Sequence, residues 1–219
     1  DYFLIRLRAP GISAAVQPGQ FVDVELPNTP HLLMRRPFSV YDAEGDALGV
    51  LYKRVGQGTA LMAELQPGAK LNLLGPLGNG FPPPPEGKRV LLVAGGYGCA
   101  ATYLIAKRMP NPGTCLIGGR TAADLLLDDK FREAYYEVAV STDDGSEGHH
   151  GVVTDLLERE LQQAGPELPV VYACGPNAML RAVARCVLAR EHDAYLSLDQ
   201  NMCCGVGACY SCVVKLKAD

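Results

Sequence analysis

A run of four prolines, at positions 82–85, divides the chain into two parts with different hydrophobic patterns. Proline cannot donate to a strand ladder or continue a helix, so the run predicts a stiff, extended connector. Before it, short stretches alternate between apolar and polar residues and are separated by glycine or proline turns. After it, continuous apolar stretches alternate with glycine turns and helical segments. We therefore place a domain boundary at the proline run and expect a different architecture on each side.

The first part, residues 1–86, is predicted to form an antiparallel β-barrel. Its period of two is typical of strands that bury one face, and the turns between them are short. The strands are expected at residues 3–7, 21–26, 36–42, 48–54 and 70–74.

The second part, residues 87–192, is predicted to be an α/β domain with a doubly wound parallel sheet. Alternation of buried strands and helices favours that fold, which binds nucleotides at the carboxyl ends of its strands. The strands are expected at residues 89–94, 114–118, 136–141 and 170–173, and the helices at 100–108, 122–127, 152–163 and 178–190.

Composition narrows the class of protein. The formal net charge is −4 and no basic stripe is present, so we expect no nucleic-acid partner. The longest apolar run, residues 90–94, is too short to cross a bilayer, so we expect no membrane partner either. Four cysteines, at positions 99, 115, 174 and 186, are scattered, and no signal-like segment is present. A reducing, cytoplasmic location is therefore expected.

Cys204, Cys209 and Cys212 have the CxxxxCxxC spacing of plant-type [2Fe–2S] proteins. Gly205 and Gly207 permit the positive φ angles and close backbone approach that such a loop requires. We therefore predict a small iron–sulfur domain over residues 193–219, with these three cysteines as metal ligands. A zinc site and chemically inert thiols are the alternatives, although no histidine follows His192 to support zinc.

A fourth cluster ligand is expected, yet no cysteine follows Cys212. Either the chain stops short of that ligand, or Cys203 replaces it, or no cluster forms. The chain also begins inside a strand pattern without an initiator methionine. We therefore expect both ends to be trimmed.

Arg36, Pro37, Phe38 and Ser39 stand at the start of a predicted strand. An arginine can bind a pyrophosphate through two hydrogen bonds, and a serine hydroxyl can bond the edge of a flavin ring. The alternative is a solvated arginine beside an edge strand.

The next strand carries Leu51, Tyr52 and Lys53, followed by a glycine turn with Gly58 and then Thr59. An aromatic side chain can stack on a flat ring, and bare glycine amides can bind phosphate. Thr59 is expected to open a helix whose N-terminus favours an anion.

Gly95, Gly96 and Gly98 join a predicted strand to a helix, where a doubly wound sheet binds a pyrophosphate. The sequence GGYG is not the full GxGxxG motif, and glycine turns of this kind also serve packing alone.

Cys174, Gly175 and Pro176 end another strand at the same edge of the sheet. The cysteine could lie against a nicotinamide, with the glycine admitting the ring and the proline starting the helix. A buried cysteine that acts as a small apolar residue is the alternative. Arg120 and residues 142–146 also follow strands here, where they could contact ribose or phosphate.

In this order, the motifs resemble the ferredoxin-reductase superfamily. More closely, RRPFSVYD, YKRVGQGT, LLGPLGNGF, VAGGYGCA, YACGPNAML and CCGVGACYSCVV resemble the electron-transfer subunits of type B dihydroorotate dehydrogenases over nearly the whole chain. The resemblance assigns FAD to the motifs of the first part, and NAD to the second. Cys203 is a departure, because the family has a small residue there.

The resemblance also implies a function in pyrimidine biosynthesis. An FMN-containing dihydroorotate dehydrogenase catalytic subunit would supply electrons, which this chain would pass through [2Fe–2S] and FAD to NAD⁺ within a heterotetramer. One alternative is a reductase subunit of a hydrogenase, sulfide-reducing or electron-bifurcating complex. Another is a redox-sensing or zinc-stapled binding module, which would leave the flavin motifs without a use.

Overall fold

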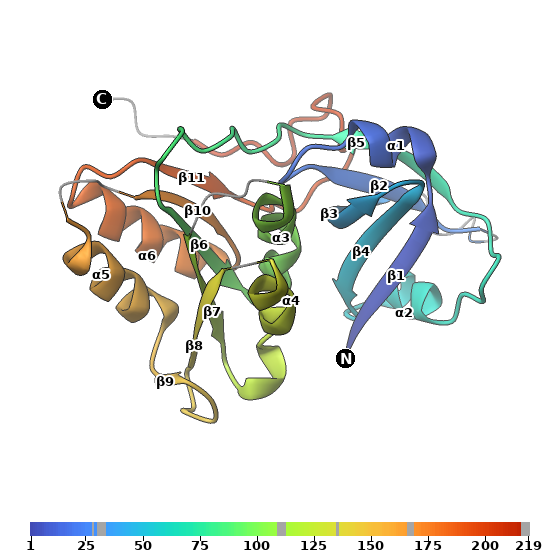
Figure 1. Ribbon diagram of the computed structural model, residues 1–219. Coiled ribbons are helices and arrows are strands. Elements are labelled where there is room, and N and C mark those ends of the chain that lie inside the picture. The colour runs from blue at the N-terminus through green and yellow to red at the C-terminus, as the bar shows by residue number, and fades with distance from the viewer. Residues whose placement is uncertain (28, 30–33, 109–112, 135, 166–168, 216–219) are drawn as a thin grey trace.

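The computed structural model describes residues 1–27, 29, 34–108, 113–134, 136–165 and 169–215. Two sheets lie side by side, one from each side of the proline run (Figure 1). The chain passes from the first sheet to the second once and then returns, through its last residues, to the first. That return places the cysteine loop against the sheet that is built earliest in the sequence.

The first sheet has five antiparallel strands in the order β1-β4-β3-β2-β5. The predicted antiparallel arrangement is confirmed. Among the described residues no pairing joins β1 to β5, so the strand order itself does not close a barrel. The elements of this part are β1 (Tyr2–Arg8), α1 (Pro10–Ala15), β2 (Phe21–Glu25), β3 (Arg36–Glu44), β4 (Ala47–Lys53), α2 (Gln57–Ala63) and β5 (Asn72–Leu77).

The second sheet has six parallel strands in the order β11-β10-β6-β7-β8-β9. Its central strands β6 and β10 are completely buried, which explains their continuous apolar sequences. The predicted parallel α/β sheet is confirmed. The strands are β6 (Val90–Gly95), β7 (Gly113–Gly119), β8 (Glu137–Thr142), β9 (His149–His150), β10 (Val170–Cys174) and β11 (Ala194–Ser197).

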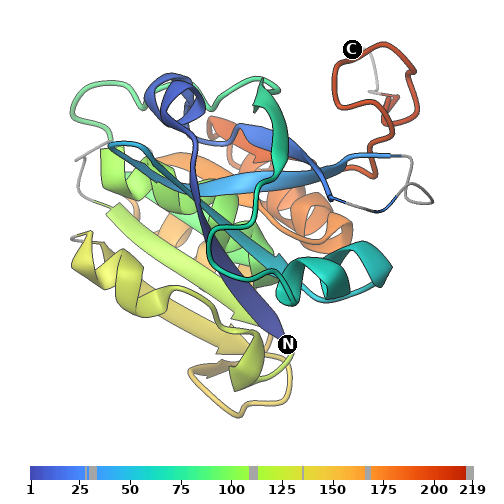
Figure 2. The ribbon, with the colours of Figure 1, turned by 90° about the vertical axis from the view of Figure 1, so that its right-hand side faces the viewer.

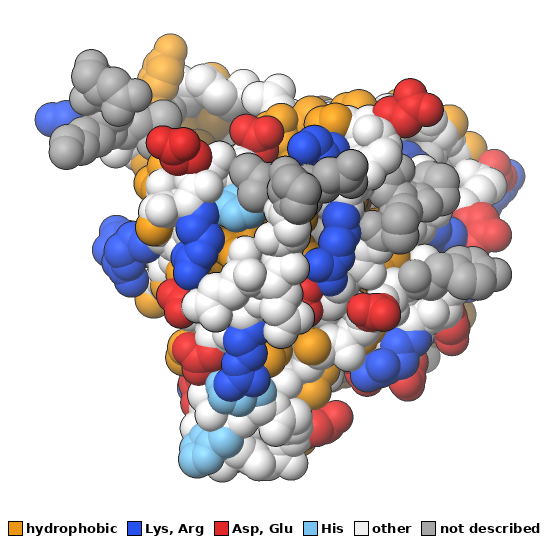
Figure 3. Space-filling view, turned by 60° about the vertical axis from the view of Figure 1, so that its left-hand side comes forward, with side chains coloured by type: hydrophobic (Ala, Val, Ile, Leu, Met, Phe, Trp, Pro, Cys, Tyr) orange, Lys and Arg blue, Asp and Glu red, His pale blue; other side chains and the backbone are white. Residues whose placement is uncertain are grey.

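Helices cover both faces of the second sheet (Figure 1). One face packs against α5 (Val153–Gln163) and α6 (Asn177–Leu188), and the other against α3 (Cys99–Arg108) and α4 (Asp128–Glu133). Among the described residues, no helix combines the length and apolar character needed to cross a membrane. On the face shown in Figure 3, acidic and basic side chains are interspersed.

The helix predicted over residues 122–127 is wrong. A single 3-10 turn, η2 (Ala122–Asp124), stands there, and helix α4 begins only after Leu127, whose φ is 65°. Asp128 in the first turn suits a helix N-terminus, and the fully buried Phe131 anchors the helix to the core. The apolar residues of 122–127 pack as an irregular segment instead of as one helical face.

Strand β11 lies beyond residue 192, where we placed the end of the second domain. Ala194 to Ser197 pair in parallel with Val171 to Cys174 of β10, so the parallel sheet extends to residue 197. The four-residue strand is too short to show a periodic pattern in the sequence. Its position matters because the chain runs directly from this sheet into the cysteine loop.

Aromatic rings and an ion pair fix the two sheets to one another. Tyr41 of β3 stacks on Tyr103 of α3 with ring centroids 4.9 Å apart, and Tyr103 contacts Phe131 edge to face at 5.4 Å. Nearby, the Lys107 ammonium lies 2.7 Å from a carboxylate oxygen of Asp42. A continuous core therefore spans the junction between the two sheets.

Candidate functional site

The first cluster of predicted residues lies where β3 begins and α2 begins. A side chain on Gly58 would place its Cβ 2.5 Å from Nε of Arg36, so the guanidinium group lies directly over the glycine backbone. Arg36 also donates to the carbonyl oxygen of Met34. A cation held over bare backbone beside a helix start is a cradle that fits a phosphate group.

Helix α2 begins at Gln57, so Thr59 is its third residue and does not open it as predicted. The Thr59 hydroxyl accepts hydrogen bonds from the amides of Val55 (2.9 Å) and Gly56 (3.1 Å). Thr59 thus shapes the turn that leads into the helix. Pro37, Phe38 and Ser39 are half-buried on β3, directly after Arg36.

Tyr52 is not positioned to stack on a ligand. Its side chain is 4 % exposed and packs against Phe3, with ring centroids 5.6 Å apart, and against Phe38, at 5.7 Å. Burial raises the pKa of its hydroxyl. Leu51 is also buried, in the core between the two sheets. Both residues can offer only their backbone groups to a ligand.

Lys53, in contrast, reaches the junction between the sheets, where it meets residues that sequence reasoning missed. Its ammonium lies 3.2 Å from the Tyr2 hydroxyl and 3.6 Å from the Asp124 carboxylate. Tyr2 donates to Asp124 at 2.8 Å, and Arg120 lies 3.7 Å from the same carboxylate. The Tyr2 hydrogen bond, followed by the nearby cations, lowers the pKa of Asp124.

The predicted glycines after β6 lie against the Cys174 and Gly175 motif at the carboxyl edge of the second sheet. Ala94 is the register partner of Cys174. A Cβ on Gly98 would lie 2.8 Å from the Gly175 amide nitrogen, and one on Gly175 would lie 2.6 Å from Cε of Met179. Only glycine permits this close approach of the turn after β6 to the turn after β10.

The remaining glycines of this turn have different surroundings. A Cβ on Gly95 would meet Sδ of Met179 at 2.7 Å and Cδ of Pro176 at 2.9 Å. Gly96, with a φ of 53°, faces the Tyr2 hydroxyl at 3.9 Å from its ideal Cβ position. The edge of the second sheet therefore touches the first sheet at Tyr2, beside the Lys53 and Asp124 pair.

Cys174 is 1 % exposed, and burial raises the pKa of its thiol to about 12. The nearby Ser197 hydroxyl offsets part of that rise. A neutral thiol in this position is a small hydrogen-bonding group and not a thiolate nucleophile. The half-exposed Tyr97 lies over the same edge.

The cysteine loop has partly exposed thiols and an internal hydrogen-bond pattern. Sγ of Cys204 accepts the amides of Ala208 (3.3 Å) and Cys209 (3.4 Å). Hydrogen bonds from Ser211 lower the pKa of the Cys209 thiol to about 6. Amides that point at sulfur and an acidic thiol fit an iron–sulfur ligand set. Within the described part of the chain, however, no three potential ligands converge on a common metal position.

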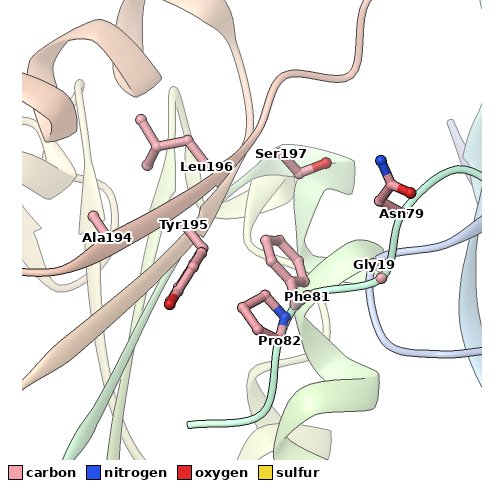
Figure 4. Close-up of a pocket in the computed structure, with 9 residues that line it drawn as sticks. Gly19, Asn79, Phe81, Pro82, Ala194, Tyr195, Leu196 and Ser197 are labelled. Atoms are coloured by element: carbon pink, nitrogen blue, oxygen red, sulfur yellow. The ribbon is translucent and has the colours of Figure 1, made fainter.

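A cavity of about 320 Å³ lies between the proline connector and β11 (Figure 4). Phe81 and Pro82 line one side, and Tyr195 and Ser197 line the other. The Tyr172 hydroxyl donates to the Pro82 carbonyl oxygen at 2.9 Å, which ties the connector to the second sheet. None of the site residues predicted from the sequence lines this cavity.

Comparisons with known proteins agree with this geometry. Residues 92–185 match the family model described as the oxidoreductase NAD-binding domain. The dihydroorotate dehydrogenase B (NAD(+)) electron transfer subunit of Bacillus caldolyticus is 44 % identical over 205 residues, which are 90 % of this chain and 77 % of that protein. The subunit of the same name from Desulforamulus reducens is 34 % identical over 219 residues, covering 98 % and 83 %.

Solved structures show the same fold. A structure described as the NADH-dependent reduced ferredoxin-NADP oxidoreductase, reported for flavin-based electron bifurcation, has a TM-score of 0.84 and 30 % identity, covering 97 % of this chain and 76 % of its own. The ferredoxin reductase of carbazole 1,9a-dioxygenase has a TM-score of 0.76 and 25 % identity, covering 90 % and 64 %. These relatives support FAD and NAD binding. The chain belongs to the family of dihydroorotate dehydrogenase B electron transfer subunits, and it is an NAD-linked flavin oxidoreductase subunit.

Proposed function

We propose that this chain carries electrons from an FMN-containing dihydroorotate dehydrogenase catalytic subunit to NAD⁺, with a [2Fe–2S] cluster and FAD as its cofactors. The observation that carries the proposal is that one chain holds three motif sets: the arginine cradle and the cysteine loop on the first sheet, and the glycine edge on the second. The relatives' shared name supplies the partner enzyme and the nucleotide. The proposed units are residues 1–86 for FAD, residues 87–197 for NAD, since β11 belongs to the parallel sheet, and the residues after 197 for the cluster.

FAD is assigned to the first sheet. Arg36 would bind the pyrophosphate, since its guanidinium lies over Gly58 and beside the start of α2. Pro37, Phe38 and Ser39 would border the flavin ring. Leu51, Tyr52, Lys53, Gly58 and Thr59 would contribute backbone groups, and Lys53 a cation as well.

NAD is assigned to the carboxyl edge of the second sheet. Gly95 and Gly98 pack closely against the turn after β10, Gly96 leaves open space beside its backbone, and Arg120 pairs with Asp124 near this turn. Cys174, Gly175 and Pro176 would border the nicotinamide. Burial raises the pKa of the Cys174 thiol to about 12, so at neutral pH the residue would border the ring as a neutral thiol and would not act as a base.

Cys204, Cys209 and Cys212 are assigned to the cluster, whose fourth ligand is not identified among the described residues. When bound, the cluster carries single electrons and the flavin exchanges them for hydride equivalents. The chain's own part is to hold these groups near each other and to exclude water. The aromatic core at the junction of the sheets supports that task by fixing their separation.

Apolar side chains around the cysteines favour a protein partner at this loop. Val206, Tyr210 and Val213 are 55 %, 75 % and 66 % exposed. Exposed apolar groups gathered beside redox ligands are typical of a docking surface. We assign this surface to the FMN-containing subunit.

The test is a visible spectrum with iron and acid-labile sulfide analysis on protein purified without oxygen, followed by addition of the catalytic subunit and dihydroorotate. Flavin bands, iron and NAD⁺ reduction would support the proposal. If flavin is found without iron, the chain is a plain flavin reductase. If both cofactors are absent, the enzymatic function is refuted.

A second candidate is a reductase subunit of an electron-bifurcating complex. It is favoured by the TM-score of 0.84 to the structure that was reported for flavin-based electron bifurcation. The electron donor separates the two candidates. NADH formation that requires dihydroorotate and its catalytic subunit supports the first, and NADH formation that requires reduced ferredoxin supports the second.

A further inference from the structure

Asp23 is a buried carboxyl group on β2 that the function described above does not use. The residue is 2 % exposed and lies in register with Pro37 of the arginine motif. Burial raises the pKa of its side chain, and the nearby Arg35 offsets part of that rise. Among the described residues no hydrogen bond to this carboxyl group is present. Among the described residues, the fully enclosed side-chain atoms without a partner are Ser141 Oγ and His192 Nδ1, so what distinguishes Asp23 is the segment that covers it.

The carboxyl group of Asp23 contacts the cysteine loop at Gly205. A Cβ on Gly205 would lie 2.8 Å from Cγ of Asp23 and closer still to its Oδ2. Gly205 also has a φ of 67°, which favours glycine. By comparison, Gly207 has a φ of 77°, but nothing lies within 4 Å of its Cβ position. The loop therefore presses on the first sheet at Gly205 and stands free of it at Gly207.

This contact joins two parts of the chain that are far apart in sequence. Figure 2 shows the C-terminal loop projecting from the body of the molecule. Asp23 meets the loop one residue after Cys204 and pairs across the sheet with the arginine motif. The same residue thus touches the loop assigned to the cluster and the strand assigned to the flavin.

We propose that Asp23 is a positioning residue whose buried carboxyl group seats the cysteine loop on the flavin-binding sheet. The proposal deepens the function proposed above, since it concerns how the cluster loop is held near the flavin. The fit is steric and polar: a short side chain ends against a glycine backbone, where Cα–H groups contact the oxygen. Asparagine has the same shape and should preserve the seat, whereas alanine should leave it empty.

The test is hydrogen exchange, by mass spectrometry, of the full chain with its flavin bound. The informative amides are those of Ala208 and Cys209, because both bond to Cys204 Sγ when the loop is seated. Asp23→Ala should speed their exchange about tenfold or more, whereas Asp23→Asn should leave it within about twofold of the original. The amides of β2 should remain slow in both variants, which excludes global unfolding.

Glycine variants give a second, independent arm that leaves Asp23 intact. Gly205→Ala and Gly207→Ala both impose alanine on a positive φ, so they match in backbone strain. Only Gly205→Ala should also collide with Asp23, and it should therefore speed loop exchange more than Gly207→Ala. Combining Asp23→Ala with Gly205→Ala should speed loop exchange by less than the two single effects together, because the collision is gone and only the backbone strain at Gly205 remains.

Unchanged loop exchange in Asp23→Ala would overturn the proposal, as would equal effects of the two glycine variants. Strict additivity in the double variant would also overturn it. Hydrogen exchange is also measured with and without iron, so the role of Asp23 can be judged separately from the cluster. If Asp23→Ala speeds loop exchange in a protein that binds no iron, the cluster is refuted and the role of Asp23 is supported. If the protein binds iron and Asp23→Ala leaves loop exchange unchanged, the role of Asp23 is refuted and the cluster is supported.

Discussion

Replacing Gly58 with alanine should separate FAD binding from stability. The new Cβ would lie 2.5 Å from Nε of Arg36 and 3.2 Å from Cδ and Cζ, so the two side chains cannot keep their positions. An arginine side chain is flexible, whereas α2 is held by its packing. We therefore expect the guanidinium group to swing away and the helix to stay.

The size of each effect follows from the group that moves. A hydrogen bond from a charged donor contributes about 1.5–3 kcal/mol, so loss of the Arg36 contact should weaken FAD binding about 10- to 150-fold. The same change puts alanine in a helix, where it is favoured over glycine by about 1 kcal/mol. The free energy of unfolding of the FAD-free protein should therefore rise or stay unchanged.

The assay is calorimetric titration of FAD into protein freed of flavin, with thermal unfolding of the same samples. Gly11→Ala is a matched control, because Gly11 also lies in a short helix and nothing is within 4 Å of its Cβ position. Arg36→Ala removes the guanidinium group altogether and therefore gives the largest expected loss of FAD affinity. An unchanged FAD dissociation constant in Gly58→Ala would refute the assignment of Arg36 to the pyrophosphate.

Three further variants test the other parts of the site. Cys209→Ser should abolish dihydroorotate-dependent NAD⁺ reduction while NADH oxidation by an artificial acceptor persists, and unchanged physiological transfer would exclude a relay through this residue. Asp124→Asn should lower the free energy of unfolding at pH 7 by about 1–2 kcal/mol, through loss of the Tyr2 and cation contacts. Because these contacts lower the pKa of Asp124 below its usual 3.8, the deficit should be full above that pH and shrink as the pH falls below it, which thermal unfolding across pH would show. Lys107→Ala should destabilise the protein by about 1–2 kcal/mol, since it leaves the buried Asp42 carboxylate without its 2.7 Å partner, and urea unfolding that matches wild type would contradict this.

Elements with a strong local pattern were predictable from the sequence. Residues 90–94 form a continuous apolar run because β6 is covered by helices on both faces, and the strand lies where it was expected. Helix α1 and strand β11 were missed because neither is long enough to repeat a pattern. The helix predicted at 122–127 failed because its apolar residues pack without helical periodicity.

Site residues were predictable only where a motif is contiguous. The glycine edge and the cysteine loop were predictable because their residues are adjacent in sequence. Tyr2 and Asp124, in contrast, are 122 residues apart and meet only in the folded chain. Tyr52 illustrates the opposite error. An aromatic residue in a flavin motif suggested stacking on a ligand, but its ring completes the core between Phe3 and Phe38.

Asp23 shows why long-range contact defeats local reading. In the alternating segment of residues 21–26, an aspartate reads as the solvent-facing position of a half-buried strand. The structure buries it because the cysteine loop, about 180 residues later, returns to cover that face. A polar residue on the outer face of a sheet can thus mark where a distant segment docks. In this chain the docked segment is the one that holds the thiols, and the sheet beneath it is the one that holds the arginine cradle. The two are joined through a contact that neither motif reveals by itself.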